Sequence, residues 1–107
     1  MTVYRNLDQY DRSNVLFRDG KILRYDKKKH TAEMQHIDYG LGAFQSDVFR
    51  RYAVDTVLDL ESVYKDLISG NQLSGFEVTR RFYEIGSPAG LEETRAYLQS
   101  RRGVSPR

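Results

Sequence analysis

The pattern of apolar and polar positions predicts strands near the amino terminus. Residues 2–4 are β-branched or aromatic and favour a short strand. Residues 14–18 and 21–25 are strand-like runs that flank Asp19 and Gly20. A two-residue Asp-Gly connection between such runs is a strong hairpin signal, because glycine accepts a positive φ. We therefore predict a β-hairpin at this point of the chain.

An apolar run over residues 37–44, IDYGLGAF, predicts a buried strand that contains Gly40 and Gly42. Glycine inside a strand marks a bulge, or a place where a ligand or another backbone comes close. The alternative is that these glycines only relieve crowding between packed layers. The run is therefore a candidate for ligand contact as well as for the core.

Helical periodicity is clearest in the middle of the chain. Residues 46–52 fit a short helix that Ser46 or Asp47 would cap. Asp59 then opens a longer helix, and Gly70 occupies the position of a left-handed C-cap. The residues spaced for one apolar stripe against a sheet are Leu60, Val63, Tyr64, Leu67 and Ile68.

The last third of the chain predicts two strands and a helix. The strands cover residues 76–79 and 82–85, and Ser87-Pro88 supplies an N-cap and a first helical residue. The helix should run to about residue 100. Its inward face should hold Leu91, Thr94 or Arg95, and Leu98, and residues 103–107 should fray. Together these elements predict a single α/β domain over residues 1–107, with a mixed sheet and a hairpin.

Composition and charge exclude several classes of protein. The 107 residues carry 17 basic and 15 acidic side chains, a net charge of +2, which is too weak a bias to indicate nucleic acid or an anionic membrane surface. The absence of cysteine excludes disulfides and thiolate metal sites. The start, MTVYRN, has neither the basic nor the apolar region of a signal peptide, and we expect a cytoplasmic protein.

Three segments, in order and spacing, resemble a known family. They are RYDKK, then HIDYGLGAF, then RFYEIGSPAGLEETRAYL. This set is similar to the second half of the sugar-phosphate nucleotidyltransferases that make nucleoside-diphosphate sugars. The similarity is closest to the mannose-1-phosphate or heptose-phosphate guanylyltransferase-like branch, and it extends over nearly the whole chain.

The resemblance implies a fold and a reaction. The family fold is a Rossmann-like α/β/α sandwich, of which this chain would be the carboxy-terminal half. The amino-terminal half holds the glycine-rich loop for the nucleoside triphosphate (NTP), and this chain lacks that loop. In such enzymes a sugar 1-phosphate oxygen attacks the α-phosphorus of the NTP and expels pyrophosphate. Mg²⁺, the cofactor expected for the complete enzyme, neutralises the phosphates.

The resemblance also implies substrate-binding residues. Asp26 and Lys27 match a Glu-Lys pair that meets the sugar and its phosphate, although the run Lys27 to Lys29 also fits a solvated loop. Asp38 stands where relatives carry an asparagine that binds sugar hydroxyls, just before Gly40. Aspartate accepts hydrogen bonds but cannot donate them as an amide does. Tyr39 is either a wall of the pocket or a core tyrosine.

Glu84 lies in FYEIGSP, where family members carry a metal-facing aspartate. The resemblance makes Glu84 the candidate metal ligand, and the alternative is a solvated glutamate at a strand end. We expect Lys27, Asp38 and Glu84 to converge on one concave face at the strand ends. The two histidines lack metal-ligand spacing, so we expect His30 and His36 at the surface or in loops.

Two functional hypotheses follow. In the first, the chain is the sugar-phosphate side of a nucleotidyltransferase and is inactive alone; the complete enzyme would bind a sugar 1-phosphate and an NTP. In the second, it is a non-catalytic binding or assembly module built on the same half-fold. A half-sheet exposes an edge and an apolar flank, so it would pair with a second copy or with the missing half.

Overall fold

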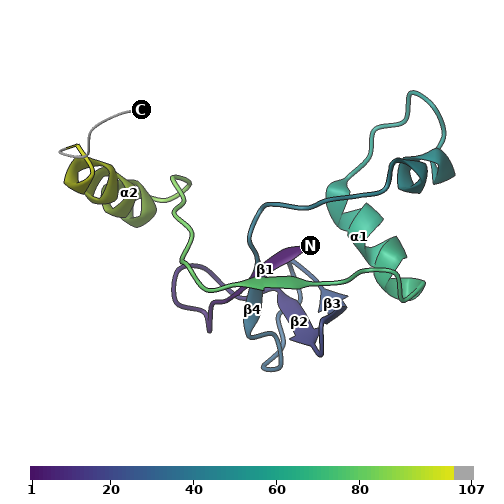
Figure 1. Cartoon of the computed structure of the whole chain (residues 1–107), viewed down its shortest axis with the longest axis horizontal. Helices are drawn as coiled ribbons and strands as arrows, with labels where there is room; N and C mark the ends of the chain where they lie inside the picture. The colour runs from purple at the N-terminus through teal and green to yellow at the C-terminus, as the bar shows by residue number, and fades with distance from the viewer. Residues whose placement is uncertain (103–107) are drawn as a thin grey trace.

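A computed structural model describes residues 1–102. Its strands form one mixed five-stranded sheet with the order β3-β2-β4-β1-β5 (Figure 1). The predicted α/β class with a mixed sheet and a hairpin is confirmed at this level. In chain order the elements are β1 (Thr2–Arg5), β2 (Val15–Arg18), β3 (Lys21–Tyr25), β4 (His36–Asp38), the 3-10 helix η1 (Ser46–Arg51), α1 (Leu60–Ser69), β5 (Phe76–Val78) and α2 (Pro88–Ser100).

The strand directions decide which loops meet at which edge of the sheet. β2 is antiparallel to both β3 and β4, so β3 and β4 run in the same direction. β1 is antiparallel to β4, and β5 is parallel to β1. The carboxyl ends of β3 and β4 therefore lie at one edge, and β5 ends at the opposite edge.

The hairpin of β2 and β3 forms as predicted. Arg18 pairs with Lys21, and the two residues between them, Asp19 and Gly20, have φ values of 53° and 78°. Two successive positive φ values match the right-handed twist of the strands, as in the favoured two-residue hairpin turns.

Helix α1 covers one face of the sheet and makes the core with it. Its N-cap is Asp59, whose carboxylate accepts from the Glu61 N–H, and Val63, Tyr64 and Leu67 of the predicted apolar stripe are buried. Leu60, at the start of that stripe, is 48% exposed, so the prediction is wrong for this residue. Gly70 is the C-cap, but its φ is −87°, and Asn71 takes the left-handed conformation with φ 54°. The left-handed prediction for Gly70 is therefore wrong by one residue. The core side chains are Met1, Val3, Val15, Ile22, Tyr25, Val48, Val63, Tyr64, Leu67 and Leu73.

Three predicted elements are shorter or different in the structure. Of the run 37–44 only the first residues are strand, because Gly40 has φ 89° and turns the chain away. Residues 46–52 form the 3-10 helix η1, and its N-cap is Gln45 without a side-chain bond, in place of the predicted caps. Residues 82–85 are not a strand, since the sheet ends at β5 within the described residues.

Helix α2 forms where predicted but does not cover the sheet. Ser87 caps it, accepting from the Gly90 N–H, and Pro88 is its first residue. Leu91 and Leu98 are 41% and 59% exposed, so the expectation that they face inward is wrong. Figure 1 shows α2 at the end of an extended connection, apart from the sheet. The local sequence does not predict that α2 lies apart from the sheet, because capping residues and periodicity indicate only where a helix begins and which side of it is apolar.

The dimensions of the chain reflect this separation. Its radius of gyration is 16.2 Å, whereas a compact domain of about 100 residues has about 13 Å. We refer below to residues 1–82 as the body, because Arg81 and Phe82 still pack on Tyr10, and to residues 83–102 as the α2 segment. Among residues 1–102, no helix has the length and apolar character needed to cross a membrane.

Candidate functional site

The edge at which β3 and β4 end gathers three of the predicted site residues. Asp26 and Lys27 directly follow β3, and Asp38 is the last residue of β4. Tyr25 links the two strand ends, since its hydroxyl donates to the Asp38 carboxylate over a long 3.5 Å. Positions eleven or more residues apart in the sequence thus share one edge because the strands run in the same direction.

The Asp26 carboxylate organises the loop after β3. Its Oδ1 accepts from the backbone N–H groups of Lys28 and Lys29, each at 2.9 Å. These bonds, the one from Lys29 foremost, hold the pKa of Asp26 below its ordinary value. The carboxylate therefore shapes the turn, and the lysine side chains are left to extend from it.

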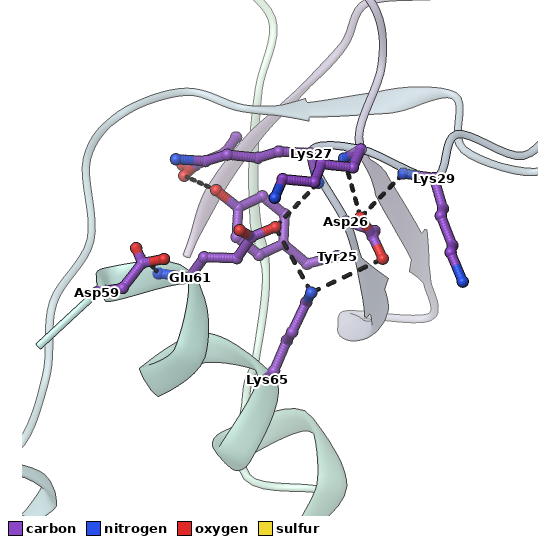
Figure 2. A network of polar contacts seen from close by, with 9 residues as sticks. Tyr25, Asp26, Lys27, Lys29, Asp59, Glu61 and Lys65 are labelled. Carbon is purple, nitrogen blue, oxygen red and sulfur yellow. Dashed lines mark hydrogen bonds and ion pairs between the residues drawn. The ribbon is translucent and has the colours of Figure 1, made fainter.

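A charged bridge joins this loop to the first turns of α1, as Figure 2 shows. The Lys65 ammonium lies between two carboxylates, 3.7 Å from Asp26 and 3.6 Å from Glu61. Glu61 also accepts from the backbone N–H of Lys27 at 3.0 Å. Sequence reasoning missed Glu61 and Lys65, although their i,i+4 spacing on a predicted helix was an available signal.

The Lys27 ammonium and the Asp38 carboxylate are the charged groups at this edge that are available to bind a ligand. Within residues 1–102 no carboxylate lies within ion-pair distance of the Lys27 Nζ. Asp38 accepts from the Gly40 N–H at 3.0 Å, and its own N–H donates to Asn14 Oδ1. One cation and one acceptor at the same edge suit a ligand that carries both a phosphate and hydroxyl groups.

Tyr25 carries the strongest electrostatic perturbation at this edge. Burial in the core, and then the nearby Asp38 charge, raise the pKa of the Tyr25 phenol well above its ordinary value. Its ring stands edge-on to the ring of Tyr64 from α1, with centroids 5.5 Å apart. The Tyr25 phenol therefore stays neutral and can donate to Asp38. Its buried ring anchors the carboxyl end of β3 to the core.

The two glycines near the site have different roles. Gly40 needs its positive φ, and a Cβ there would meet nothing within 4 Å. At Gly42 a Cβ would collide with the Tyr64 hydroxyl. Gly42 therefore fits the alternative that glycine relieves crowding, because the group that comes close is the side chain of Tyr64 and not a backbone.

Tyr39 points to the other face of the sheet. Its ring packs near Tyr4 and Phe82, with centroids 6.4 Å away in both cases. It also lines an open pocket of about 480 Å³ together with Arg80, Arg81, Tyr83 and Tyr97. Tyr39 is thus a pocket wall, but it is not brought together with Asp26, Lys27 and Asp38. A second pocket of about 540 Å³ lies between residues 43–51 and the starts of β1 and β5.

Glu84 lies in the connection just before α2 and is not brought to the other site residues. Its carboxylate accepts from the Gly86 N–H at 2.8 Å and from the Ser87 hydroxyl at 2.6 Å. The Ser87 hydroxyl is the main reason that the pKa of Glu84 is held below its ordinary value. A Cβ at Gly90 would collide with this carboxylate. In this structure Glu84 therefore supports the helix start, and the expected convergence of Lys27, Asp38 and Glu84 does not occur.

The histidines and acidic residues of the described chain do not gather into a metal-ligand group. Among residues 1–102, no three or more His, Asp or Glu side chains are grouped as they would be around a metal ion. His36 is buried in β4, and its Nε2 lies 2.8 Å from Glu77. The surface prediction for His36 is therefore wrong, while His30 does lie in a loop, against the Ser13 carbonyl.

Comparisons with known proteins find no match for this chain. No model of a protein family matches the chain, and no curated protein or solved structure matches it either. The resemblance to nucleotidyltransferases therefore stays a prediction that depends on the three ordered motifs. The geometry of the site edge is the independent observation on which a functional proposal can be built.

Proposed function

We propose that this chain is the sugar-phosphate-binding half of a nucleotidyltransferase that joins a sugar 1-phosphate to an NTP. The supporting observation is the common edge of Asp26, Lys27 and Asp38. These residues match the sugar-phosphate positions of the family, and they reach one edge from two separate strands. The Rossmann-like arrangement of the complete domain is part of the same proposal.

The three residues divide the work of binding. The Lys27 ammonium is a compact cation suited to a phosphate oxygen, and it has no competing ion pair within the described part of the chain. Asp38 accepts hydrogen bonds from sugar hydroxyls. Asp26 is engaged by Lys28, Lys29 and Lys65, so it positions the loop that presents Lys27.

Mg²⁺ is the cofactor proposed for the complete enzyme, with Glu84 as its candidate protein ligand. Mg²⁺ commonly uses only one or two carboxylates together with substrate phosphates. In this structure the Glu84 carboxylate is bonded to Gly86 and Ser87, so its role as a ligand depends on the motif FYEIGSP alone. The chain alone should therefore bind substrate without turning it over.

Binding is tested by titrating the protein with mannose 1-phosphate, with mannose as the phosphate-free control, and following amide shifts by NMR. We expect shifts at residues 25–29 and 38–40 only with the phosphorylated sugar. Lys27→Gln should weaken binding about tenfold or more, since a hydrogen bond to a charged group contributes about 1.5–3 kcal/mol. Lys21→Gln, at the other end of β3, is the matched control. Equal weakening by both variants, or no binding, would refute the proposal.

Catalysis is tested separately by release of pyrophosphate. The protein is mixed with mannose 1-phosphate, Mg²⁺ and each of the four NTPs. We expect no release above the protein-free background because the triphosphate loop is missing. Robust turnover would refute the claim of inactivity but not the binding site.

A further inference from the structure

The open pocket beside the connection between β5 and α2 has a lining of one chemical kind (Figure 1). Its volume of about 480 Å³ lies within the range of roughly 300–1,000 Å³ that is common for small-molecule sites. Such sites are usually lined mainly by apolar side chains. The described lining of this pocket is instead arginine and tyrosine, namely Tyr39, Arg80, Arg81, Tyr83 and Tyr97. Guanidinium and phenol groups both donate hydrogen bonds, so the lining favours an anion.

Stacking holds the rings of the pocket in place. The guanidinium carbon of Arg81 lies 3.7 Å from the ring centroid of Tyr10 and 4.1 Å from that of Tyr83. Tyr83 also stacks on Tyr97, with centroids 4.2 Å apart and 20° between the ring planes. The Arg101 guanidinium lies over the Tyr97 ring at 5.5 Å. Because these contacts order the side chains before a ligand binds, little of their freedom remains to be lost on binding.

The phenol hydroxyls of the pocket are available as donors. Within residues 1–102, the tyrosine hydroxyls that donate to another group of the chain are those of Tyr25 and Tyr52. The hydroxyls of Tyr39, Tyr83 and Tyr97 therefore have no acceptor among the described residues. Three donors of the lining are thus left for a ligand.

The two arginines of the pocket differ in how far they are already engaged. Arg81 Nη1 lies 3.3 Å from the Glu93 carboxylate, and its Nε donates to the Phe82 carbonyl at 3.0 Å. Arg80 is exposed, and it has no ion pair with a carboxylate of residues 1–102. The positive charge that is left to attract a ligand is therefore that of Arg80.

We propose that this pocket binds the phosphate group of a small phosphorylated molecule. Arg80 is the charged contact, and the hydroxyls of Tyr83 and Tyr97 are further donors. A phosphate monoester carries about −1.5 to −2 charges at neutral pH and has three terminal oxygens, so it accepts from donors that come from several elements. A carboxylate has only two oxygens in one plane, which a single arginine fork satisfies.

This site is distinct from the proposed sugar-phosphate site. Asp26, Lys27 and Asp38 do not belong to the lining of the pocket. The inference therefore does not rest on the proposed function.

Binding is tested by titrating the protein with inorganic phosphate at constant ionic strength and following the backbone amides of residues 80–83 and 97 by NMR. Tyr39 is left out of this readout, because its amide lies in the range expected to respond at the site edge. We expect saturable shifts in the millimolar range, and several-fold weaker binding of acetate. The absence of saturable shifts, or an equal response to acetate, would overturn the inference.

Two arginine variants test the charged contact. Arg80→Gln should weaken the binding of inorganic phosphate about tenfold, because it removes charge-assisted hydrogen bonds. Arg50→Gln is the matched control, since Arg50 is an exposed arginine of η1 and its loss removes the same charge outside the pocket. Equal weakening by both variants would show only a general effect of charge and would overturn the proposed contact.

Two further variants locate the bound phosphate. Tyr83→Phe keeps the ring that stacks on Tyr97 and removes only a hydroxyl, so it should weaken binding about threefold, with an unchanged near-UV circular dichroism spectrum. Lys27→Gln should leave the shifts at residues 80–83 unchanged, because Lys27 belongs to the site edge. Loss of these shifts in Lys27→Gln would overturn the inference, because it would place the bound phosphate at that edge.

Discussion

The two helices of the protein carry similar local signals and have opposite fates. Both begin with a side-chain cap, Asp59 for α1 and Ser87 for α2, and both present leucines at helical spacing. Leu67 of α1 is 4% exposed, whereas Leu98 of α2 is 59% exposed. The difference shows that caps and periodicity decide whether a helix forms, while the strands beneath it decide whether its apolar side is buried.

Replacing a leucine by alanine should lower the free energy of unfolding by very different amounts in the two helices, and this is the largest difference that we expect. Leu67→Ala removes a buried side chain and should lower the free energy of unfolding by about 2–5 kcal/mol. Leu98→Ala removes a side chain that is largely in water, and the expected loss for the monomer is within about 0.5 kcal/mol. Urea unfolding at low protein concentration measures both. Similar losses would mean that α2 is packed against the body in solution.

A buried polar network in the body is expected to matter next. Asn6 is fully buried, and its amide group contacts Asp11, Ser13 and Tyr10 in the loop after β1. Asn6→Ala leaves those partners unsatisfied and should cost about 1–3 kcal/mol. Gln9→Ala is the control, because Gln9 is an exposed residue of the same loop after β1. The comparison is read from urea unfolding curves.

The cap of α2 should act locally. Ser87 accepts from the Gly90 N–H and donates to the Glu84 carboxylate. Ser87→Ala should destabilise the helix by about 1 kcal/mol. Because α2 is not packed on the sheet, the unfolding midpoint of the body should stay unchanged while far-UV ellipticity falls. A parallel shift of the body midpoint would contradict the separation of the two regions.

The smallest effect at neutral pH is expected at the site edge. The pKa of Tyr25 is raised in the folded state, so the neutral phenol is favoured and its contribution is complete below the ordinary value of 10.0. Stability is then lost as the pH rises above that value. Tyr25→Phe should change stability little at pH 8 and should reduce the alkaline loss. Tyr64, whose pKa is also raised, keeps part of the slope. An unchanged alkaline profile would show that Tyr25 is not the responsible group.

Short-range signals predicted most of the elements. The Asp19-Gly20 turn, the Asp59 cap and the Ser87-Pro88 helix start depend on backbone conformations within a few residues, and all three are found. The failures depend on distant partners. Residues 82–85 have strand-like composition, but within the described chain no neighbouring strand pairs with them.

The candidate site residues likewise fall into those that the sequence could place and those that it could not. Asp26, Lys27 and Asp38 meet because the hairpin fixes the direction of β3 and the sheet order fixes that of β4. Glu61 and Lys65 enter through the docking of α1, and a sequence pattern alone does not state where a helix docks. Glu84 precedes α2 and is bonded to its N-cap Ser87, so its position relative to the site depends on the placement of that helix.

The most direct test of this account is hydrogen exchange at two protein concentrations. The amides of α1 should be protected equally at both, because α1 is packed within the body. The amides of α2 should exchange much faster than those of α1 at both concentrations, because α2 is not packed on the sheet and Leu91 and Leu98 are exposed. Protection of α2 equal to that of α1 at every concentration would contradict the account, because it would mean that α2 packs on its own chain.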